Sequence, residues 1–273
     1  MKFSVLISIY KNEIPSFLDE ALNSILNQTT KPSEIVLVKD GSLTKELDDI
    51  ITKYNINNIN LFKIIQLKEN VGLGKALNIG IQNCKYDIVA RMDSDDISTC
   101  DRFEKQLKIL KENKKIDIVG SYIGEFSISK EKIDKIRKVP IEDIEIKKYS
   151  KRRNPLNHVS VMYKKQAVLD AGNYQHSLYT EDYDLWVRMF INGCEAINIP
   201  QVLVKVRCND HMYQRRGGLK YIKSEYHLQN RFLKLKHITL YEFVTNIALR
   251  VGVRIIPNKL RKIVYTKLLR SNQ

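Results

Sequence analysis

Two kinds of block alternate along the first hundred residues, and each has its own hydrophobic period. Short runs rich in β-branched residues predict strands at 3–10, 34–38, 61–67 and 87–92. Between them, apolar residues recur every third or fourth position, which predicts helices at 15–26, 47–54 and 73–83. Because strand and helix alternate, the pattern predicts an α/β fold with a parallel sheet covered by helices on both faces.

Polar residues follow each of the four predicted strands. The four polar ends are 10–13, 40–42, 70–75 and 93–96. Ligands of open parallel sheets bind beyond the carboxyl ends of the strands, so four polar ends together favour a binding site there. For any single polar end, the favoured explanation is that its residues cap the next helix.

The most distinctive polar end is Asp93-Ser94-Asp95, followed by Asp96. In an extended backbone, residues i and i+2 project to the same side, which places two carboxylates where a hard divalent cation can be held. Three adjacent carboxylates repel one another, and a bound cation offsets that repulsion. The alternative is a solvated turn in which Asp96 caps a helix that begins near Asp101.

Several common classes of protein are excluded by missing motifs. No Gly-x-Gly-x-x-Gly follows the first strand, Gly72-x-Gly74 lacks a third glycine at the required spacing, and no strand is followed by a P-loop. The four cysteines form no Cys-x-x-Cys pair, which argues against a zinc site and a disulfide framework and fits reduced thiols in a cytosolic protein. No run approaches the ~20 apolar residues of a membrane-spanning helix.

The net charge of +15 is concentrated in the last quarter of the chain. Residues 205–273 contain 16 basic and 3 acidic residues, whereas residues 1–204 are nearly balanced. Apolar residues recur at helical spacing over 240–255 and again, after Pro257, over 260–268. A basic amphipathic helix fits an anionic membrane surface. It fits equally well a helix that packs on the rest of the protein and leaves its charges in water.

Five motifs, in their order and spacing, resemble those of family 2 glycosyltransferases. They lie at 4–13, 38–42, 70–78, 91–96 and 180–186, and together they cover most of the chain. Within that family the chain is most similar to bacterial enzymes of O-antigen, capsule and exopolysaccharide (amylovoran-type) assembly, a similarity that residues 154–158 and 212–218 strengthen. The resemblance implies an inverting transferase with a GT-A fold: a Rossmann-like, mostly parallel sheet with helices on both faces and a basic helical C-terminal extension.

The same resemblance implies a division of the chain. A catalytic domain is expected at 1–204, with a nucleotide-sugar half at about 1–100 and an acceptor half at about 101–204. Residues 205–273 are expected to form a basic loop followed by amphipathic helices.

The donor site implied by the resemblance lies at the strand ends. Tyr10 and Glu13 would line the base pocket, and Asp40 would accept a hydrogen bond from uracil. The stretch around Asn70, Gly72 and Lys75 would close over the nucleoside and diphosphate, and Asp93 would hold the ribose side. An ammonium at Lys75 suits phosphate oxygens, although a solvated helix face explains that residue as well.

Metal binding and proton removal are assigned by the same resemblance. Asp95 would bind Mn²⁺ or Mg²⁺, both of which prefer oxygen ligands, and His211 would add a ligand from the C-terminal loop. Asp182 would be the general base that removes the proton from the acceptor hydroxyl. The alternative for Thr180, Glu181 and Asp182 is an ordinary helix N-terminus. Trp186 is expected in the core.

Contacts to the acceptor or to a diphosphate are expected from five residues: His158, Glu181, Arg207, Arg215 and Arg216. We expect His158 to precede a strand at 159–163, and an ordinary histidine at a strand end is an equal alternative. The arginines can pair bidentately with diphosphate oxygens, or can belong to a solvated basic loop.

The function expected from the resemblance is transfer of glucose or galactose from a UDP-sugar to a saccharide, with a GlcNAc- or GalNAc-diphosphate-lipid as acceptor and a β-linkage as product. The expected location is cytoplasmic, on the inner-membrane surface, without a nucleic-acid partner. This requires Asp40, Asp93, Asp95 and Asp182 to gather around one cation. Two alternatives are a nucleic-acid-binding protein that uses the basic tail and an inactive membrane-docked assembly factor.

Overall fold

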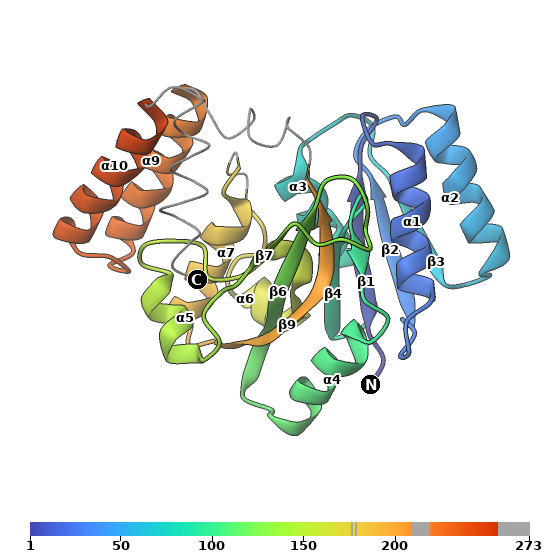
Figure 1. The fold of residues 1–273 in the computed structure, drawn as a ribbon, viewed down its shortest axis with the longest axis horizontal. Helices are drawn as coiled ribbons and strands as arrows, with labels where there is room; N and C mark the ends of the chain where they lie inside the picture. Colours follow the sequence, from blue (N-terminus) through green and yellow to red (C-terminus); the bar gives the residue numbers. More distant parts are fainter. Residues whose placement is uncertain (176, 178, 209–218, 256–273) are drawn as a thin grey trace.

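The computed structural model describes residues 1–175, 177, 179–208 and 219–255. A central sheet carries helices on both faces, and a helical hairpin lies at one end of the molecule (Figure 1). The strands are β1 (Ser4–Ile9), β2 (Glu34–Lys39), β3 (Phe62–Gln66), β4 (Ile88–Asp93), β5 (Ile97–Ser98), β6 (Ile116–Phe126), β7 (Lys135–Arg137), β8 (Met162–Lys164) and β9 (Glu195–Arg207). The helices are α1 (Pro15–Leu26), α2 (Lys45–Asn57), α3 (Leu73–Asn83), α4 (Arg102–Glu112), α5 (Asp143–Tyr149), η1 (His158–Ser160), α6 (Lys165–Asp170), α7 (Glu181–Ile191), α9 (Leu219–Lys234) and α10 (Leu240–Ile255).

The strands form one mixed sheet in the order β3-β2-β1-β4-β8-β6-β9-β5, and β7 pairs with β6. The four strands predicted from the sequence, β1 to β4, pair in parallel, as expected for β-α units joined by right-handed crossovers. β8 runs antiparallel to β4 and to β6, whereas β6 and β9 pair in parallel over most of their length. The predicted α/β class is confirmed, and the parallel pairing is confined to these two groups of strands.

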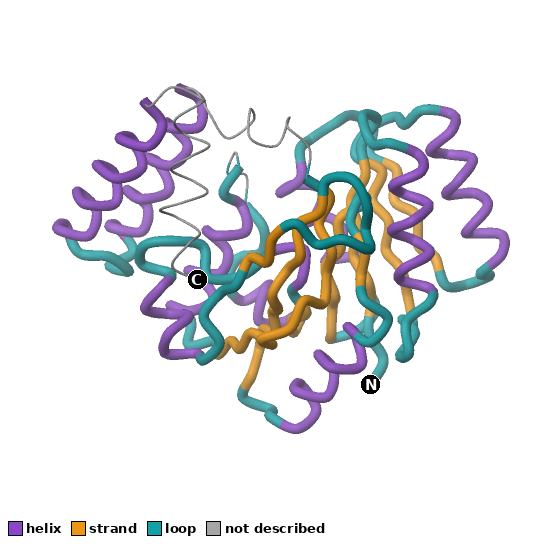
Figure 2. Tube along the Cα trace, viewed as in Figure 1, coloured by secondary structure: helices purple, strands orange, loops and turns teal. Residues whose placement is uncertain are grey.

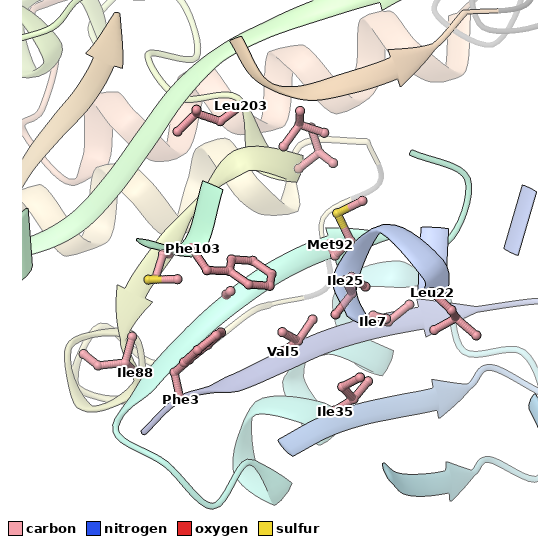
Figure 3. Close-up of a cluster of buried hydrophobic side chains, with 14 of the residues drawn as sticks. Phe3, Val5, Ile7, Leu22, Ile25, Ile35, Ile88, Met92, Phe103 and Leu203 are labelled. Atoms are coloured by element: carbon pink, nitrogen blue, oxygen red, sulfur yellow. The ribbon is translucent and has the colours of Figure 1, made fainter. Parts of the chain in front are cut away.

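Alternate residues of the central strands feed two separate hydrophobic cores. Val5 and Ile7 of β1 point to the face covered by α1, α2 and α4, and Figure 3 shows Ile7 close to Leu22 and Ile25 of α1. Leu6 points to the opposite face, which α3, α6 and α7 cover. Because strands buried on both faces lack polar alternation, their sequences are continuous apolar runs.

A third core fixes the C-terminal hairpin, α9 and α10, onto the rest of the protein. Leu228 and Phe232 of α9 and Ile238 of the turn pack with Tyr183 and Val187 of α7. The rings of Tyr183 and Phe232 meet edge to face, with centroids 5.0 Å apart. In Figures 1 and 2 the two helices lie side by side, beyond α7 and away from the sheet.

Two sequence predictions need correction or completion. The strand expected at 159–163 is shorter and begins later: His158–Ser160 form the 3-10 turn η1, and the strand spans Met162–Lys164. Helix α10 was predicted at its observed position, but α9 was not predicted. The second apolar stripe, at 260–268, lies outside the described residues. Among the helices of the described part, we find none long and apolar enough to span a bilayer.

Candidate active site

The carboxyl ends of β1, β2 and β4 meet at one edge of the sheet. The register pairs Ser8 of β1 with Asp93 of β4, and Ile9 with Lys39 of β2. The backbone N–H of Asp40 donates to the carbonyl oxygen of Ile9 at 2.8 Å. This register places Asp40 and Asp93 on the two sides of the end of β1, as the sequence pattern predicts.

Asp40 organises the loop that begins α3. Its carboxylate accepts hydrogen bonds from the backbone N–H groups of Val71 (2.7 Å) and Gly72 (3.1 Å). Asn70 adds a bond from its side-chain amide to the Asp40 carbonyl oxygen, at 3.2 Å. Gly72 has φ +86°, a conformation that favours glycine. Asp40 therefore fixes the shape of the loop expected over the nucleoside, and its contact with uracil stays a prediction.

Glu13, in the loop that follows β1, forms a hydrogen bond with the loop that contains the acidic cluster. One carboxylate oxygen of Glu13 accepts the Ser94 hydroxyl at 2.5 Å, and the other accepts the backbone N–H of Ile14 at 2.8 Å. Tyr10 is 37% exposed beside it, which leaves part of its ring accessible for stacking. Lys75 is exposed in the first turn of α3.

Asp93, Asp95 and Asp96 form a cluster in which one carboxylate oxygen from each residue lies within 4.8 Å of the other two. Asp96 is 2% exposed and accepts the backbone N–H of Arg207 at 2.9 Å. It therefore secures the end of β9 and does not cap α4, whose N-cap residue is Asp101. The solvated-turn alternative for this sequence is thus wrong.

Burial and mutual repulsion make the cluster costly to ionise. Burial, with Asp93 and Glu13 as the next causes, raises the pKa of Asp95 to about 7. The pKa of Asp96 is also raised, by burial and then by Asp95. Three carboxylates provide hard oxygen donors that suit Mg²⁺ or Mn²⁺, and a cation would offset their mutual repulsion.

Arg91 is the buried cation beneath this cluster. It is 1% exposed on β4 and forms an ion pair with Asp93 through one terminal nitrogen. Within the described part of the chain, its Nε and its other terminal nitrogen have no hydrogen-bond partner. Burial raises the pKa of Asp96 and of Asp182, and the charge of Arg91 partly offsets this rise. Arg91 thus acts on both carboxylate groups of the site.

Asp182 lies in the first turn of α7 and is held on both carboxylate oxygens. The backbone N–H of Tyr183 donates to one at 2.7 Å, and the side-chain amide of Asn154 donates to the other at 2.6 Å. Burial raises the pKa of Asp182 despite these bonds. Burial and then Asp182 raise the pKa of its neighbour Glu181 to about 7. A carboxylate with a raised pKa is a stronger base, which suits proton removal from a hydroxyl.

Helices α3 and α7 approach each other at their N-termini through Gly74. A Cβ atom at Gly74 would lie 3.0 Å from the carbonyl oxygen of Gln175 and 3.2 Å from the Cβ of Glu181. The lack of a side chain at Gly74 lets the start of α3 lie against Glu181 at the start of α7. Direct contacts thus run from Asp40 through Gly72 and Gly74 to Glu181.

Comparison with known proteins identifies the family. The model of the family described as "Glycosyl transferase family 2" matches residues 4–171. The chain belongs to this family. It is 40% identical over 269 residues, 98% of this chain and 97% of that protein, to an Escherichia coli protein named UDP-Gal:alpha-D-GlcNAc-diphosphoundecaprenol beta-1,3-galactosyltransferase. It is 38% identical, over 97% of this chain and 98% of that protein, to the amylovoran biosynthesis glycosyltransferase AmsE of Erwinia amylovora.

Solved structures show the same GT-A fold. Residues 1–349 of S. aureus TarS, in complex with UDP-GlcNAc, match with a TM-score of 0.67 and 19% identity over 92% of this chain and 72% of that one. This chain spans 45% of the longer TarS chain. A mannosyltransferase from Pyrobaculum calidifontis, in complex with GDP-Man and Mn²⁺, matches with a TM-score of 0.63 and 16% identity over 95% and 71%. The predicted family and fold are confirmed.

The other site residues of this family 2 chain are placed less directly. His158 opens η1, and its Nε2 lies 2.9 Å from the Tyr174 hydroxyl and its ring 5.9 Å from that of the buried Trp186. Burial, and then the charge of Arg91, hold the pKa of His158 well below its usual range, so the ring is neutral at pH 7. Trp186 belongs to the core, as predicted.

Arg207 is engaged with the protein around the acidic cluster. It forms an ion pair with Glu20, stacks on Phe17 at 3.8 Å, and donates from Nε to the Asp95 carbonyl oxygen at 3.3 Å. Arg207 therefore helps to hold the backbone of the acidic cluster in place, and its contact with a diphosphate remains a prediction. His211, Arg215 and Arg216 lie outside the described residues.

Sequence reasoning missed two residues of the site. Arg91 stands two positions before Asp93 on the same strand, and this i, i+2 spacing was an available signal. Asn154 was noticed only as part of a motif, because its contact with Asp182 joins residues 28 positions apart.

Proposed function

We propose that this family 2 glycosyltransferase moves a hexose from a UDP-sugar to a saccharide hydroxyl of a diphosphate-linked lipid, with inversion at the anomeric carbon. The observation that carries the proposal is the placement of Asp182. A half-buried carboxylate with a raised pKa, hydrogen-bonded on both oxygens, follows Glu181, which packs against Gly74 at the start of α3. Such an arrangement supports a base beside a donor site.

The donor half of the proposal rests on the strand ends of β1, β2 and β4. Tyr10, Glu13 and Asp40 would contact the uridine, and Asp93 the ribose. Asn70, Gly72 and Lys75 would lie along the diphosphate, where an exposed ammonium pairs with phosphate oxygens.

Asp95, with its two acidic neighbours, would hold Mg²⁺ or Mn²⁺. The cation would neutralise charge on the departing nucleoside diphosphate. The close approach of the three carboxylates supports this assignment.

The transfer step uses Asp182 as general base. Its carboxylate takes the proton of the acceptor hydroxyl while that oxygen attacks the anomeric carbon. The bond from that carbon to the diphosphate oxygen breaks on the opposite side, and UDP leaves with the electron pair. An α-linked donor then gives a β-linked product.

The E. coli relative suggests the substrates. Because its name specifies galactose transfer to GlcNAc-diphosphoundecaprenol, we propose galactose as the first donor to test, with glucose as its epimeric alternative, and a GlcNAc-diphosphate-lipid as acceptor. His158, Glu181, Arg207, Arg215 and Arg216 are the proposed acceptor or diphosphate contacts, and His211 a further metal ligand.

A lipid-linked acceptor requires the enzyme to work at a membrane surface. We assign this to residues 205–273, outside a catalytic region at 1–204, and propose peripheral binding at the cytoplasmic face of the inner membrane. The exposed apolar side chains of α10, namely Leu240, Tyr241, Val244 and Leu249, support this, together with the basic residues of the same region.

The proposal is tested by incubating the full chain with Mn²⁺, each UDP-hexose and a GlcNAc-diphosphate-lipid mimic, and detecting product by mass spectrometry. Asp182→Asn should keep UDP affinity and lose transfer by about 10³-fold. Asp95→Asn should lose the Mn²⁺-dependent part of UDP affinity. Asp49→Asn, an exposed aspartate on α2, is the matched control. No transfer with any donor, combined with no UDP binding, would contradict the proposal.

A further inference from the structure

The C-terminal hairpin holds the backbone of the short segment 150–154, the first part of the connection from α5 to η1. The side-chain amide of Asn246 in α10 donates to the carbonyl oxygen of Lys151 at 2.8 Å. Arg250, one turn further along α10, donates to the carbonyl oxygen of Arg152 at 2.7 Å. The hairpin thus contacts consecutive carbonyl groups of one segment from outside the catalytic region.

Both contacts are anchored inside the hairpin. Asn246 is 4% exposed, and its amide also donates to Gln229 of α9 at 2.9 Å. Arg250 pairs with Glu225, again on α9. Buried polar side chains that are held on two sides have few alternative orientations, so the position of the segment follows the position of the hairpin.

The same segment reaches Asp182 at its other end. Asn154 donates to Asp182 Oδ2 at 2.6 Å. A second link runs through Tyr183, the residue after Asp182, whose hydroxyl donates to the Ser150 carbonyl oxygen at 2.6 Å. The segment is therefore bonded to α10 on one side and to the first turn of α7 on the other.

We infer that Asn246 and Asn154 are positioning residues for Asp182, and that α9 and α10 fix the orientation of this carboxylate through segment 150–154. The inference rests on the proposed function of Asp182. It gives the hairpin a role in the transfer step, in addition to any contact with a membrane. Neither asparagine touches the reacting atoms, since each acts through a hydrogen bond to another part of the protein.

The first test compares Asn246→Ala with Thr245→Ala. Thr245 is the matched control, because its hydroxyl donates to the carbonyl oxygens of Tyr241 and Glu242 within its own helix. Asn246→Ala should lower kcat about tenfold, because misplacing a catalytic group slows the reaction while donor binding is unaffected. KM for the UDP-sugar and UDP affinity should stay unchanged. Equal kcat values in the two variants would overturn the inference.

The second test is a double-variant cycle with Asn154→Ala. If Asn246 acts through Asn154, the double variant should be no slower than Asn154→Ala alone, whereas independent effects would multiply. In Asn154→Ala, the acid limb of kcat should also move to higher pH. The lost N–H stabilised the charged carboxylate, while Arg91, Arg137 and Glu181 remain around it. Multiplying effects, or an unmoved acid limb, would contradict the inference.

A third measurement needs no turnover. Hydrogen exchange should speed up in residues 150–154 and at the Tyr183 amide in Asn246→Ala, and should stay unchanged in Thr245→Ala, because the Tyr183 N–H is protected by Asp182. Unchanged exchange at Tyr183 would overturn the inference even if the enzyme is active. Faster exchange without transfer activity in the parent protein would contradict only the proposed function.

Discussion

The carboxyl groups of the candidate active site lower the free energy of unfolding when they are ionised. Asp95, Asp96, Glu181 and Asp182 all have raised pKa values, and burial is the main cause in each case. A raised pKa means that the folded state binds the proton more tightly than the unfolded state does. Each of these groups therefore destabilises the fold at a pH above its own pKa.

Glu181 offers a direct measure of this cost. Its pKa is about 7 in the fold, against a usual value of 4.5. Glu181→Gln should raise the free energy of unfolding at pH 8 by about 1–3 kcal/mol, and the gain should vanish as the pH falls from 7 to below 4.5. Thermal unfolding at pH 8 and pH 5 measures it. Glu112→Gln, at an exposed glutamate of α4, is the control and should leave the thermal unfolding midpoint unchanged at both pH values. If Glu181→Gln also left the midpoint unchanged at pH 8, the prediction would be refuted.

The sequence predicts that the acidic residues of the site lie together, but it does not predict which residues contact them. Asp93 and Asp95 follow a buried strand at i, i+2 spacing, so local geometry already places them together. Within the described part of the chain, Arg91 has two buried nitrogens without a hydrogen-bond partner, and their burial depends on the packing of distant segments. The contact of Asn154 with Asp182 depends on such packing as well. No local periodicity encodes such contacts.

At the level of elements, the alternating strands and helices of the first hundred residues were predicted well, whereas the 3-10 turn η1 and the 16-residue helix α9 were not predicted. The helix expected at 73–83 is α3 with the same bounds, because its apolar spacing and its glycine start are both local. The predicted strand at 159–163 is shortened because Ser160 bonds through its side chain to Ser121 and Asn157. These tertiary bonds favour a 3-10 turn over the extended backbone that the β-branched residues suggest.

Helix α10 packs by one face and leaves another apolar face in water. Leu240, Tyr241, Val244 and Leu249 are between 55% and 77% exposed. The two alternatives for the basic tail were a helix that lies on a membrane and a helix that packs on the protein. Helix α10 has features of both, because it packs on α9 and retains an exposed apolar surface suited to lipid.

This exposed face gives a prediction for Val244→Glu. The variant should bind anionic vesicles at least about fivefold more weakly, because a charge replaces an apolar contact with the lipid. Its thermal midpoint should stay the same, since the side chain is exposed. Ile56→Glu on α2 introduces the same charge at a side chain that is 65% exposed, at the far side of the sheet from α10 (Figure 1). Co-sedimentation with vesicles compares the two, and equal losses would argue against a lipid-facing α10.

At the level of the whole molecule, charge is distributed unevenly. The last quarter contains 16 of the 46 basic residues and only 3 of the 31 acidic ones. The acidic cluster and the basic C-terminal region thus have opposite signs, and we expect this asymmetry to turn the C-terminal region toward an anionic surface.

Such an asymmetric charge predicts salt-sensitive membrane binding by the full chain. Vesicles that contain anionic lipid should bind the protein at low salt and release most of it at about 0.5 M NaCl, because screening weakens each cation's contribution of about 1 kcal/mol. Vesicles of neutral lipid alone should bind much less. Equal binding to both kinds of vesicle at every salt concentration would contradict the prediction.

The missing side chain at Gly74 has a practical consequence for engineering. Because the starts of α3 and α7 touch there, the close contact of Gly74 with Gln175 and Glu181 sets the distance between the loop before α3 and the first turn of α7. Redesign for bulkier sugars should therefore leave position 74 untouched and change the length of the connection that precedes α7.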